Sequence, residues 1–232
     1  MKKTWISDDK NQKYIGEFDG EKKHGEGTYI WEGMGEVSGK FKDDQFPNYG
    51  KFIQYGEFEY IGEMKNRDGQ FNGKGIQINL ITKDKHEGEF KDGAPHGYGV
   101  FTQNDGSTFK GNWKNGLKHG EGTLVNAIFF RSGEEKDEEF IMDGGPQTGE
   151  YKDDLPVGKF HWEMKSGRKY VGELNKDGLF HGKGERKWTD GESHVGIYKN
   201  GKTHGMGTYI YNGRFGQDTY IGNFHNGVRH GY

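Results

Sequence analysis

The sequence predicts an all-β protein, built as an elongated, single-layer antiparallel sheet of stacked β-hairpins. A motif of the form aromatic-x-Gly-x-aromatic recurs about every 23 to 26 residues, with one longer interval, and a period of this length is typical of repeat architectures. Within each copy, apolar or glycine positions alternate with polar ones, as they do along strands. The middle glycines of the nine copies are Gly16, Gly39, Gly62, Gly88, Gly111, Gly149, Gly172, Gly196 and Gly222.

The composition excludes a thick two-layer core. Only 29% of the 232 residues are hydrophobic, against about 45–50% in typical globular domains. The chain has 42 glycines, while 16 Phe, 13 Tyr and 5 Trp supply most of the apolar surface. Intrinsic disorder does not fit, because disordered chains have few aromatic residues and a high net charge. With a net charge of −3 the protein has no positive electrostatic potential that would attract nucleic acid, so we expect no nucleic-acid binding.

The chain contains no cysteine, which excludes disulfides, thiolate metal sites and cysteine nucleophiles. Its first residues lack the apolar segment of a signal peptide. No window approaches the roughly 18 apolar residues that a membrane-spanning helix needs. We therefore expect a cytoplasmic protein.

The first copy, residues 14–33, shows how each hairpin is expected to form. Its apolar and glycine residues share one face of two strands, at Tyr14, Gly16 and Phe18 and then at Gly25, Gly27, Tyr29 and Trp31. Glycine inside a strand leaves room for a ring to lie on the backbone. We expect rings of the Phe18 and Tyr29 type to cover glycines of the Gly16 and Gly27 type.

Turn signals separate the predicted strands. A dipeptide of Asp or Asn followed by Gly supplies the positive φ angles of tight turns. Within hairpins it occurs at Asp19-Gly20, Asp92-Gly93, Asn115-Gly116, Asn200-Gly201 and Asn226-Gly227, and between copies at Asp105-Gly106, Asp190-Gly191 and Asn212-Gly213. The copies around Gly39 and Gly149 lack the leading aromatic residue, and Phe46-Pro47 and Leu155-Pro156 predict proline turns there.

The pattern Tyr-x-Gly-x-[Phe/Trp]-x-x-Gly-x-x-His-Gly-x-Gly resembles the MORN repeat (membrane occupation and recognition nexus). Residues 109–122 match it at every defined position, namely Phe109, Gly111, Trp113, Gly116, His119, Gly120 and Gly122. The resemblance covers almost the whole chain and implies one continuous MORN-repeat solenoid over residues 1–232, with an insertion near 127–145. This insertion is either a projecting docking hairpin or a tolerated loop. The resemblance also implies a non-catalytic interaction role.

The residues themselves indicate no catalytic, metal or cofactor site. Histidines recur before glycine at His24, His96, His119, His181, His204 and His230. Equivalent positions in successive hairpins lie about 10 Å apart, so these rings cannot converge on one zinc ion. A phosphate-binding Gly-x-x-x-x-Gly-Lys-[Ser/Thr] motif and a Gly-x-Ser-x-Gly elbow are both absent from the sequence. We expect a protein that is not an enzyme and needs no cofactor.

The predicted function is a non-enzymatic scaffold for protein–protein interaction, with an aromatic groove that receives a peptide or helix. The predicted groove residues are Tyr14, Phe18, Tyr29, Trp31, Phe109, Trp113, Trp162, Tyr170, Tyr209 and Tyr211. These rings either bind a partner or are used up by their own neighbours. Because the chain is almost wholly repeats, it is similar to radial spoke head proteins, and we expect a ciliary, axonemal or other cytoskeletal assembly.

The sequence leaves two further kinds of partner open. Thr4-Trp5-Ile6 matches the return strand of a copy, and the sequence ends at His230-Gly231-Tyr232 before another. Open sheet edges recruit strands, which predicts end-to-end self-association or a larger assembly. The alternative function is a peripheral adaptor on anionic phosphoinositide membranes. Membrane attraction uses about four to eight clustered basic residues. The basic clusters of this sequence are smaller and lie among acidic residues: Lys2-Lys3, Lys22-Lys23, Lys165 with Arg168 and Lys169, and Arg186-Lys187.

Overall fold

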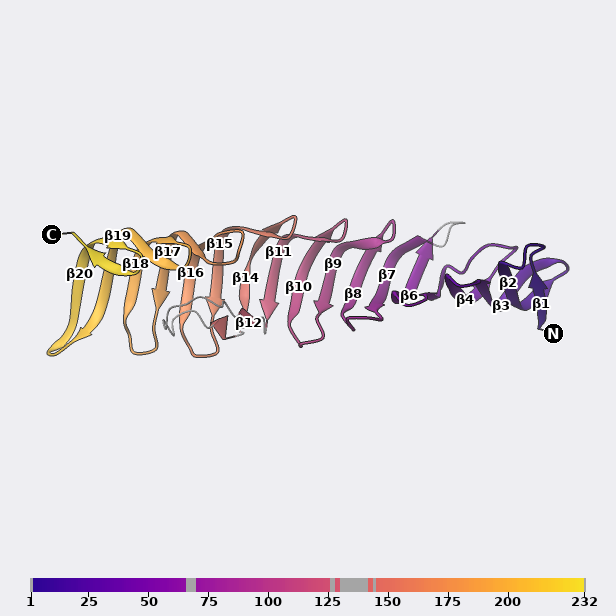
Figure 1. The fold of residues 1–232 in the computed structure, drawn as a ribbon, viewed down its shortest axis with the longest axis horizontal. Helices are drawn as coiled ribbons and strands as arrows, with labels where there is room; N and C mark the ends of the chain where they lie inside the picture. The colour runs from indigo at the N-terminus through magenta and orange to yellow at the C-terminus, as the bar shows by residue number, and fades with distance from the viewer. Residues whose placement is uncertain (1, 66–69, 126–127, 130–141, 144, 232) are drawn as a thin grey trace. The chain divides into compact units, whose positions relative to one another are not determined.

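The computed structural model describes residues 2–65, 70–125, 128–129, 142–143 and 145–231. Over these residues, 19 strands form one antiparallel sheet that does not close on itself. Each strand pairs with the next one in the chain (Figure 1), which confirms the predicted all-β fold of consecutive hairpins. Two compact units can be distinguished, residues 1–106 with 113–116 and residues 107–112 with 117–232. They are described separately below.

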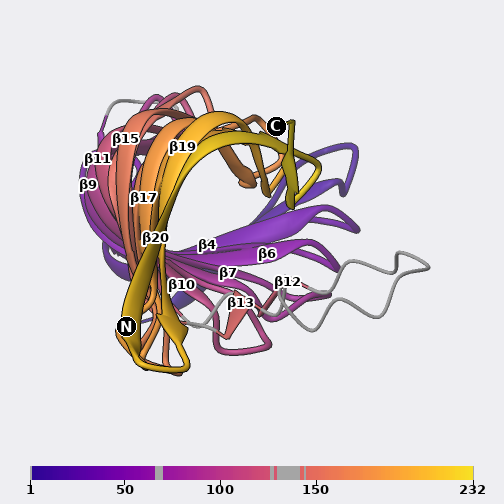
Figure 2. The same cartoon turned by 90° about the vertical axis from the view of Figure 1, so that its left-hand side faces the viewer.

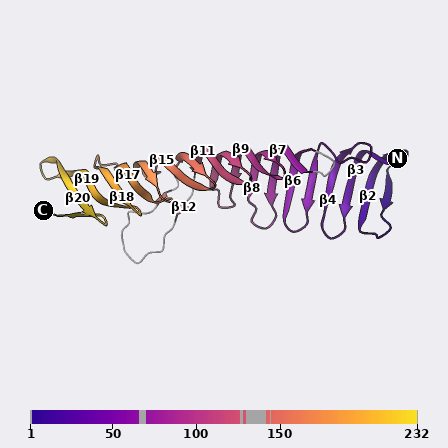
Figure 3. The same cartoon turned by 90° about the horizontal axis from the view of Figure 1, so that it is seen from above.

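The N-terminal unit consists of nine strands that follow one another without a crossover. They are β1 (Lys3–Ile6), β2 (Gln12–Asp19), β3 (Lys22–Trp31), β4 (Gly35–Phe41), β5 (Tyr49–Gln54), β6 (Phe58–Lys65), β7 (Gln70–Asn79), β8 (Lys85–Lys91) and β9 (Ala94–Thr102). Figure 3 shows the same succession of hairpins from a second direction.

The C-terminal unit continues in the same way, and β10 (Thr108–Lys114) contributes residues to both units. Its other strands are β11 (Leu117–Val125), β14 (Gln147–Lys152), β15 (Leu155–Glu163), β16 (Lys169–Leu174), β17 (Phe180–Lys187), β18 (Ser193–Lys199), β19 (Lys202–Gly213), β20 (Gly216–His225) and β21 (Val228–His230). The strands β17, β19 and β20 are bent along their length (Figure 2). In the insertion, β12 (Ile128–Phe129) pairs with β13 (Met142–Asp143), and the rest lies outside the described residues.

The His-Gly steps at 24–25, 96–97, 181–182 and 204–205 lie inside strands at β-bulges, not in turns. Between Gly16 and Phe18 the register of β2 against β3 shifts, and Gly25 on β3 has a φ of +69°. Gly182 on β17 repeats this with a φ of +60°. One type of bulge places a residue in the left-handed region, and glycine adopts this conformation without a steric cost. This requirement explains the first glycine of each Gly-x-Gly, and the bulge increases local strand twist.

The turn signals were right within most hairpins. Asn200 and Gly201 have φ angles of +50° and +87°, the combination that a two-residue type I′ hairpin requires. The Gly201 N–H also donates to the Phe180 carbonyl of the preceding hairpin at 2.8 Å. This turn therefore joins the two strands that flank it and is also hydrogen-bonded to the preceding copy.

Three turn predictions were wrong. Asp43-Asp44 and Asp153-Asp154, all with positive φ, form the turns that we placed at the following prolines. The N–H groups of Asp44 and Asp154 donate at 3.0 Å to the carbonyls of Lys23 and Lys118, which fixes these turns on the preceding hairpin.

The third wrong turn is Asn212-Gly213, which lies within β19. The hairpin turns instead at residues 214–215, because Gly213 pairs with Gly216. The Asn212 N–H donates to the Glu192 carboxylate at 3.0 Å and keeps this end of β19 in the sheet.

The glycines of successive strands lie opposite one another. The leading ring of the copy covers them, except in the copies around Gly39 and Gly149, where Pro47 and Phe160 lie over the glycine. In the N-terminal unit, Gly16 pairs with Gly27 and Gly27 with Gly39. A Cβ atom on Gly16 or on Gly27 would clash with the ring of Tyr14. The predicted covering rings, of the Phe18 and Tyr29 type, are therefore wrong. Tyr14 is completely buried, because it lies along its own strand over both bare backbones.

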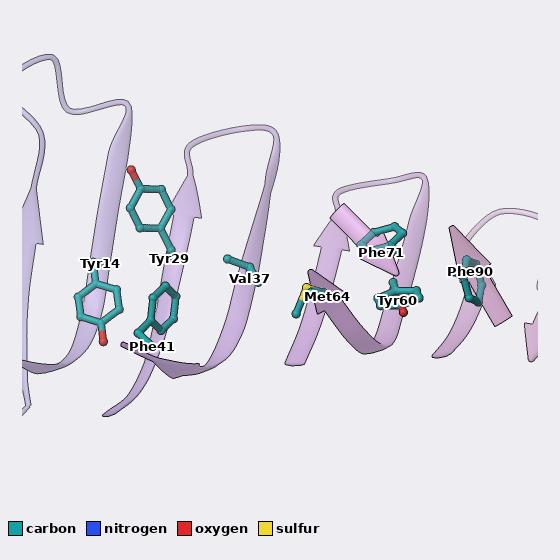
Figure 4. Close-up of a cluster of buried hydrophobic side chains, with 8 residues drawn as sticks. All are labelled: Tyr14, Tyr29, Val37, Phe41, Tyr60, Met64, Phe71 and Phe90. Atoms are coloured by element: carbon teal, nitrogen blue, oxygen red, sulfur yellow. The ribbon is translucent and has the colours of Figure 1, made fainter. Parts of the chain in front are cut away.

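Hydrogen bonds and edge-to-face contacts fix these leading rings. The Tyr60 hydroxyl donates to the Glu63 carbonyl at 2.8 Å, and Tyr170 donates in the same way to Glu173. The trailing ring of a copy is the one two residues after its middle glycine. The trailing ring Phe90 of the next copy packs edge-on against Tyr60, with ring centroids 5.1 Å apart and an angle of 83° between the ring planes. Figure 4 shows this row of buried side chains across the N-terminal unit. Such ring pairs contribute about 0.5–1.5 kcal/mol each beyond the area that they bury.

Two leading positions hold buried histidines instead of tyrosines. His86 is 4% exposed, and within the described residues neither of its ring nitrogens has a hydrogen-bond partner. His194 is buried too, but its Nδ1 lies 2.9 Å from the Tyr198 hydroxyl. Burial lowers the pKa of His86 to about 4, and burial together with the nearby charge of Arg186 lowers the pKa of His194 to about 4.

These histidines predict a loss of stability in acid. In the unfolded chain their pKa is near 6.5, so between about pH 6.5 and 4 the unfolded state binds more protons than the folded one. The free energy of unfolding therefore falls as pH falls through this window, by about 2–3 kcal/mol for each histidine at 1.4 kcal/mol per pKa unit. His86→Phe should raise the free energy of unfolding at pH 7 by about 1–2 kcal/mol and remove its share of the acid loss.

Urea denaturation of wild type and His86→Phe between pH 7 and 4 tests this prediction. Phe109 occupies the equivalent position of its own copy, so the ring fits. His194→Phe is the matched control and should gain less, because it also removes the contact with Tyr198. A pH-independent difference between wild type and His86→Phe would contradict the assignment.

Candidate binding surfaces on the aromatic face

The ten residues predicted to line an aromatic groove fall into two groups. Six are buried in the packing of the sheet, namely Tyr14, Tyr29, Phe109, Trp113, Trp162 and Tyr170. The other four are half-buried, namely Phe18, Trp31, Tyr209 and Tyr211. The leading and trailing rings thus mostly contact one another. Rings near the end of the second strand of a hairpin, such as Trp31 and Tyr211, keep part of their surface exposed. The groove assignment of the ten stays a prediction.

In the N-terminal unit, a groove of about 530 Å³ lies beside Trp31. Phe52, on β5, and the turn residues Met34 and Tyr55 also line it. Trp31 contacts Phe52 with ring centroids 6.4 Å apart, and both are packed against the buried core of this unit. Met34 is 64% exposed. This groove offers flat apolar surfaces on a rigid base.

In the C-terminal unit, a groove of about 390 Å³ lies between β17 and β21. Trp188 and Tyr209 line it, with ring centroids 5.7 Å apart. The Arg186 guanidinium lies 4.5 Å from the Trp188 ring centroid, and the Arg229 guanidinium lies 4.2 Å from that of Tyr211. Arginine over an aromatic face is an attractive arrangement of about 0.5–2 kcal/mol. This groove is both aromatic and basic.

Three tyrosines of the packed rings have raised pKa values. Burial raises the pKa of Tyr60 and of Tyr170, and raises that of Tyr151 to about 12. These phenols therefore stay neutral at physiological pH. Among the described residues, no group of three or more His, Cys, Asp or Glu side chains is placed to hold a metal ion.

Searches of known proteins identify the family. The model for the MORN repeat matches residues 14–33, 86–108, 109–127, 170–193, 194–213 and 220–232, just over half of the sequence. The chain belongs to the MORN repeat family. MORN repeats generally mediate protein or membrane interactions and are typically non-catalytic. No curated protein matched the sequence.

The hairpins β4–β5, β6–β7 and β14–β15 lie outside the matched MORN segments, and of these β6–β7 keeps the same arrangement of ring and glycines. Gly62 pairs with Gly75 under the Tyr60 ring, as Gly16 pairs with Gly27 under Tyr14. Across the described residues, no helix is long and apolar enough to span a membrane.

Sequence reasoning missed several groove residues. Trp188 occupies the same place in its MORN copy as Trp31, four residues after the second glycine, so the repeat register alone contained this signal. Phe52 belongs to a degenerate copy, where the register is harder to read. Arg229 had no signal, because its contact with Tyr211 joins β21 to β19 and depends on how these strands are placed.

Proposed function

We propose that this MORN repeat protein is a non-enzymatic scaffold that binds other proteins through its aromatic face. The observation that supports the proposal is the pair of grooves lined by half-exposed rings, at Trp31 with Phe52 and at Trp188 with Tyr209. Tyrosine and tryptophan dominate protein interfaces because they offer large, stiff contact areas. The rings are already held by packed neighbours, so little side-chain entropy is lost on binding.

Groove variants test the proposal. In one variant Trp31 and Phe52 are both replaced by alanine, and in a second variant Trp188 and Tyr209 are both replaced by alanine. The control is Lys85→Ala, because the half-buried Lys85 lies outside both grooves and pairs with Glu87 at 2.7 Å, and such pairs contribute little. Tagged proteins are used for affinity capture from cells that express the protein, with quantitative mass spectrometry, and each captured protein is retested in purified form.

We expect at least one groove variant to lose a direct partner by tenfold or more in Kd, on the order of 1.4 kcal/mol, while the control keeps it. Melting temperatures of all variants identify any variant that fails to fold. If every purified partner binds both groove variants as tightly as wild type, the aromatic face is not the binding surface.

The cellular setting of this proposal is a ciliary, axonemal or other cytoskeletal assembly, which rests only on the similarity in repeat content to radial spoke head proteins. Co-localisation of a tagged copy with axonemal tubulin tests it, and a purely diffuse cytoplasmic signal would count against it.

Attachment to anionic membranes is the second candidate function. Several residues of its basic clusters are paired with carboxylates: Lys23 with Asp44 at 3.5 Å, Lys169 with Glu163 at 3.0 Å and Lys187 with Glu185 at 2.9 Å. Arg186 is 4% exposed and cannot reach a flat bilayer. Flotation with phosphoinositide vesicles separates this candidate from the scaffold.

A further inference from the structure

The groove of the C-terminal unit is asymmetric in charge. Its lining residues, all within the described part of the chain, include three basic side chains, Arg186, Lys202 and Arg229, and no carboxylate. Its walls are the rings of Trp188 and Tyr209, with Phe224 buried behind them. The protein as a whole is slightly acidic, with a net charge of −3, so this basic lining is a local feature.

Arg229 is the most accessible cation of the groove. Its guanidinium lies 4.2 Å from the ring centroid of Tyr211 and 5.0 Å from that of Tyr220. Within the part of the chain that the structure describes, it makes no ion pair within 4 Å. A guanidinium stacked on rings keeps its N–H donors in one plane and is suited to bidentate binding of a carboxylate. The tyrosines therefore orient Arg229 before any ligand binds.

The carboxylate next to the groove is already occupied. The Tyr209 hydroxyl donates to Glu192 Oε2 at 2.6 Å, and the Asn212 N–H donates to Glu192 Oε1 at 3.0 Å. Both carboxylate oxygens thus have partners on β19, and Glu192 does not line the groove. Glu192 therefore does not neutralise Arg229. An acidic ligand could form an ion pair with this guanidinium.

We propose that this groove binds an acidic peptide segment of a partner protein, with a Glu or Asp carboxylate on Arg229 and an apolar neighbour against Tyr209 and Trp188. The charge of the lining and its ring walls together favour this ligand. The inference rests on the scaffold function proposed above and specifies the chemistry of one partner.

Fluorescence anisotropy with two labelled peptides tests the proposal. The probe is Gly-Glu-Glu-Phe-Glu-Glu-Gly, and its neutral counterpart has glutamine in place of each glutamate. We expect the acidic peptide to bind wild type at least about tenfold more tightly than the neutral one. Arg229→Gln should weaken it by about tenfold, Arg229→Lys by less, and Lys202→Gln provides a second variant of the groove.

The matched control is Arg214→Gln. Arg214 is also exposed and also lies over a ring, Phe215 at 5.6 Å, but it is not part of the groove, so this variant should bind like wild type. Equal affinity for both peptides overturns the proposal, as does an equal loss in Arg214→Gln and Arg229→Gln. Binding of phosphatidylserine vesicles that depends on Arg229, without peptide binding, also overturns it and favours a membrane. Partners that are lost when Trp188 and Tyr209 are replaced but kept by Arg229→Gln would leave the scaffold function intact and reject this inference alone.

Discussion

Gly75→Ala is expected to destabilise the protein by about 3 kcal/mol, although it adds a single methyl group. A Cβ atom on Gly75 would lie 2.5 Å from Cε2 and Cζ of the Tyr60 ring. That ring cannot move aside, because it is stacked on Phe71 at 3.8 Å and packed edge-on against Phe90. Urea denaturation followed by circular dichroism measures the change in the free energy of unfolding.

The control for this prediction is Gly56→Ala, in the turn before β6. Gly56 has a φ of +77° and nothing within 4 Å of its added Cβ, so alanine there should cost only the left-handed conformation, about 1–2 kcal/mol. The Tyr60→Val background provides a second check, since Val37 occupies the leading position of its own copy. Gly75→Ala should lower the free energy of unfolding by less in the Tyr60→Val background, because the ring that the methyl group would meet is absent there. An equal cost with and without the ring would show that the ring is not the reason for the glycine.

Tyr170→Ala is expected to lower the free energy of unfolding by about 3–5 kcal/mol. Tyr170 is completely buried, its ring stacks on Phe180 at 3.8 Å and 18°, and it packs edge-on against Tyr198. In repeat proteins each unit contacts mainly its neighbours, so the loss should be local. Hydrogen exchange should show reduced protection in β16, β17 and β18 and unchanged protection in β2 and β3.

Tyr170→Phe separates the ring from its hydroxyl. The hydroxyl donates to the Glu173 carbonyl at 2.8 Å, so this variant should cost about 1 kcal/mol and keep the ring packing. If Tyr170→Ala lowers the free energy of unfolding no more than Tyr170→Phe does, the ring itself contributes little to stability. Exchange that increases uniformly over both units would contradict the local character of the effect.

Much of the fold was readable because its signals are local. The glycine period, the alternation within each copy and the Asn-Gly turns act over a few residues, and they predicted the consecutive hairpins. The errors came where two signals compete. Asn212-Gly213 has the composition of a turn, but the bond from the Asn212 N–H to Glu192 extends β19 past it. The Asp43-Asp44 turn is stabilised by Lys23 of the preceding hairpin, which local sequence does not reveal.

The candidate site was less predictable than the fold. The sequence indicated which residues are aromatic and which face they share, but Tyr14 and Trp31 look alike in a pattern of alternation. Only the register shows that the Tyr14 ring lies over Gly16 and Gly27, whereas Trp31 lies beyond the glycines and stays half-exposed.

The sequence alone therefore determined the family, the hairpin repeat and the aromatic face, because each follows from the order of residues within one copy. The tertiary structure decided which rings remain accessible and where charge gathers among them. Arg229 lies over Tyr211 because β19, β20 and β21 are side by side in the sheet. A contact between side chains of different strands depends on strand register and bulges, and composition or periodicity cannot supply it.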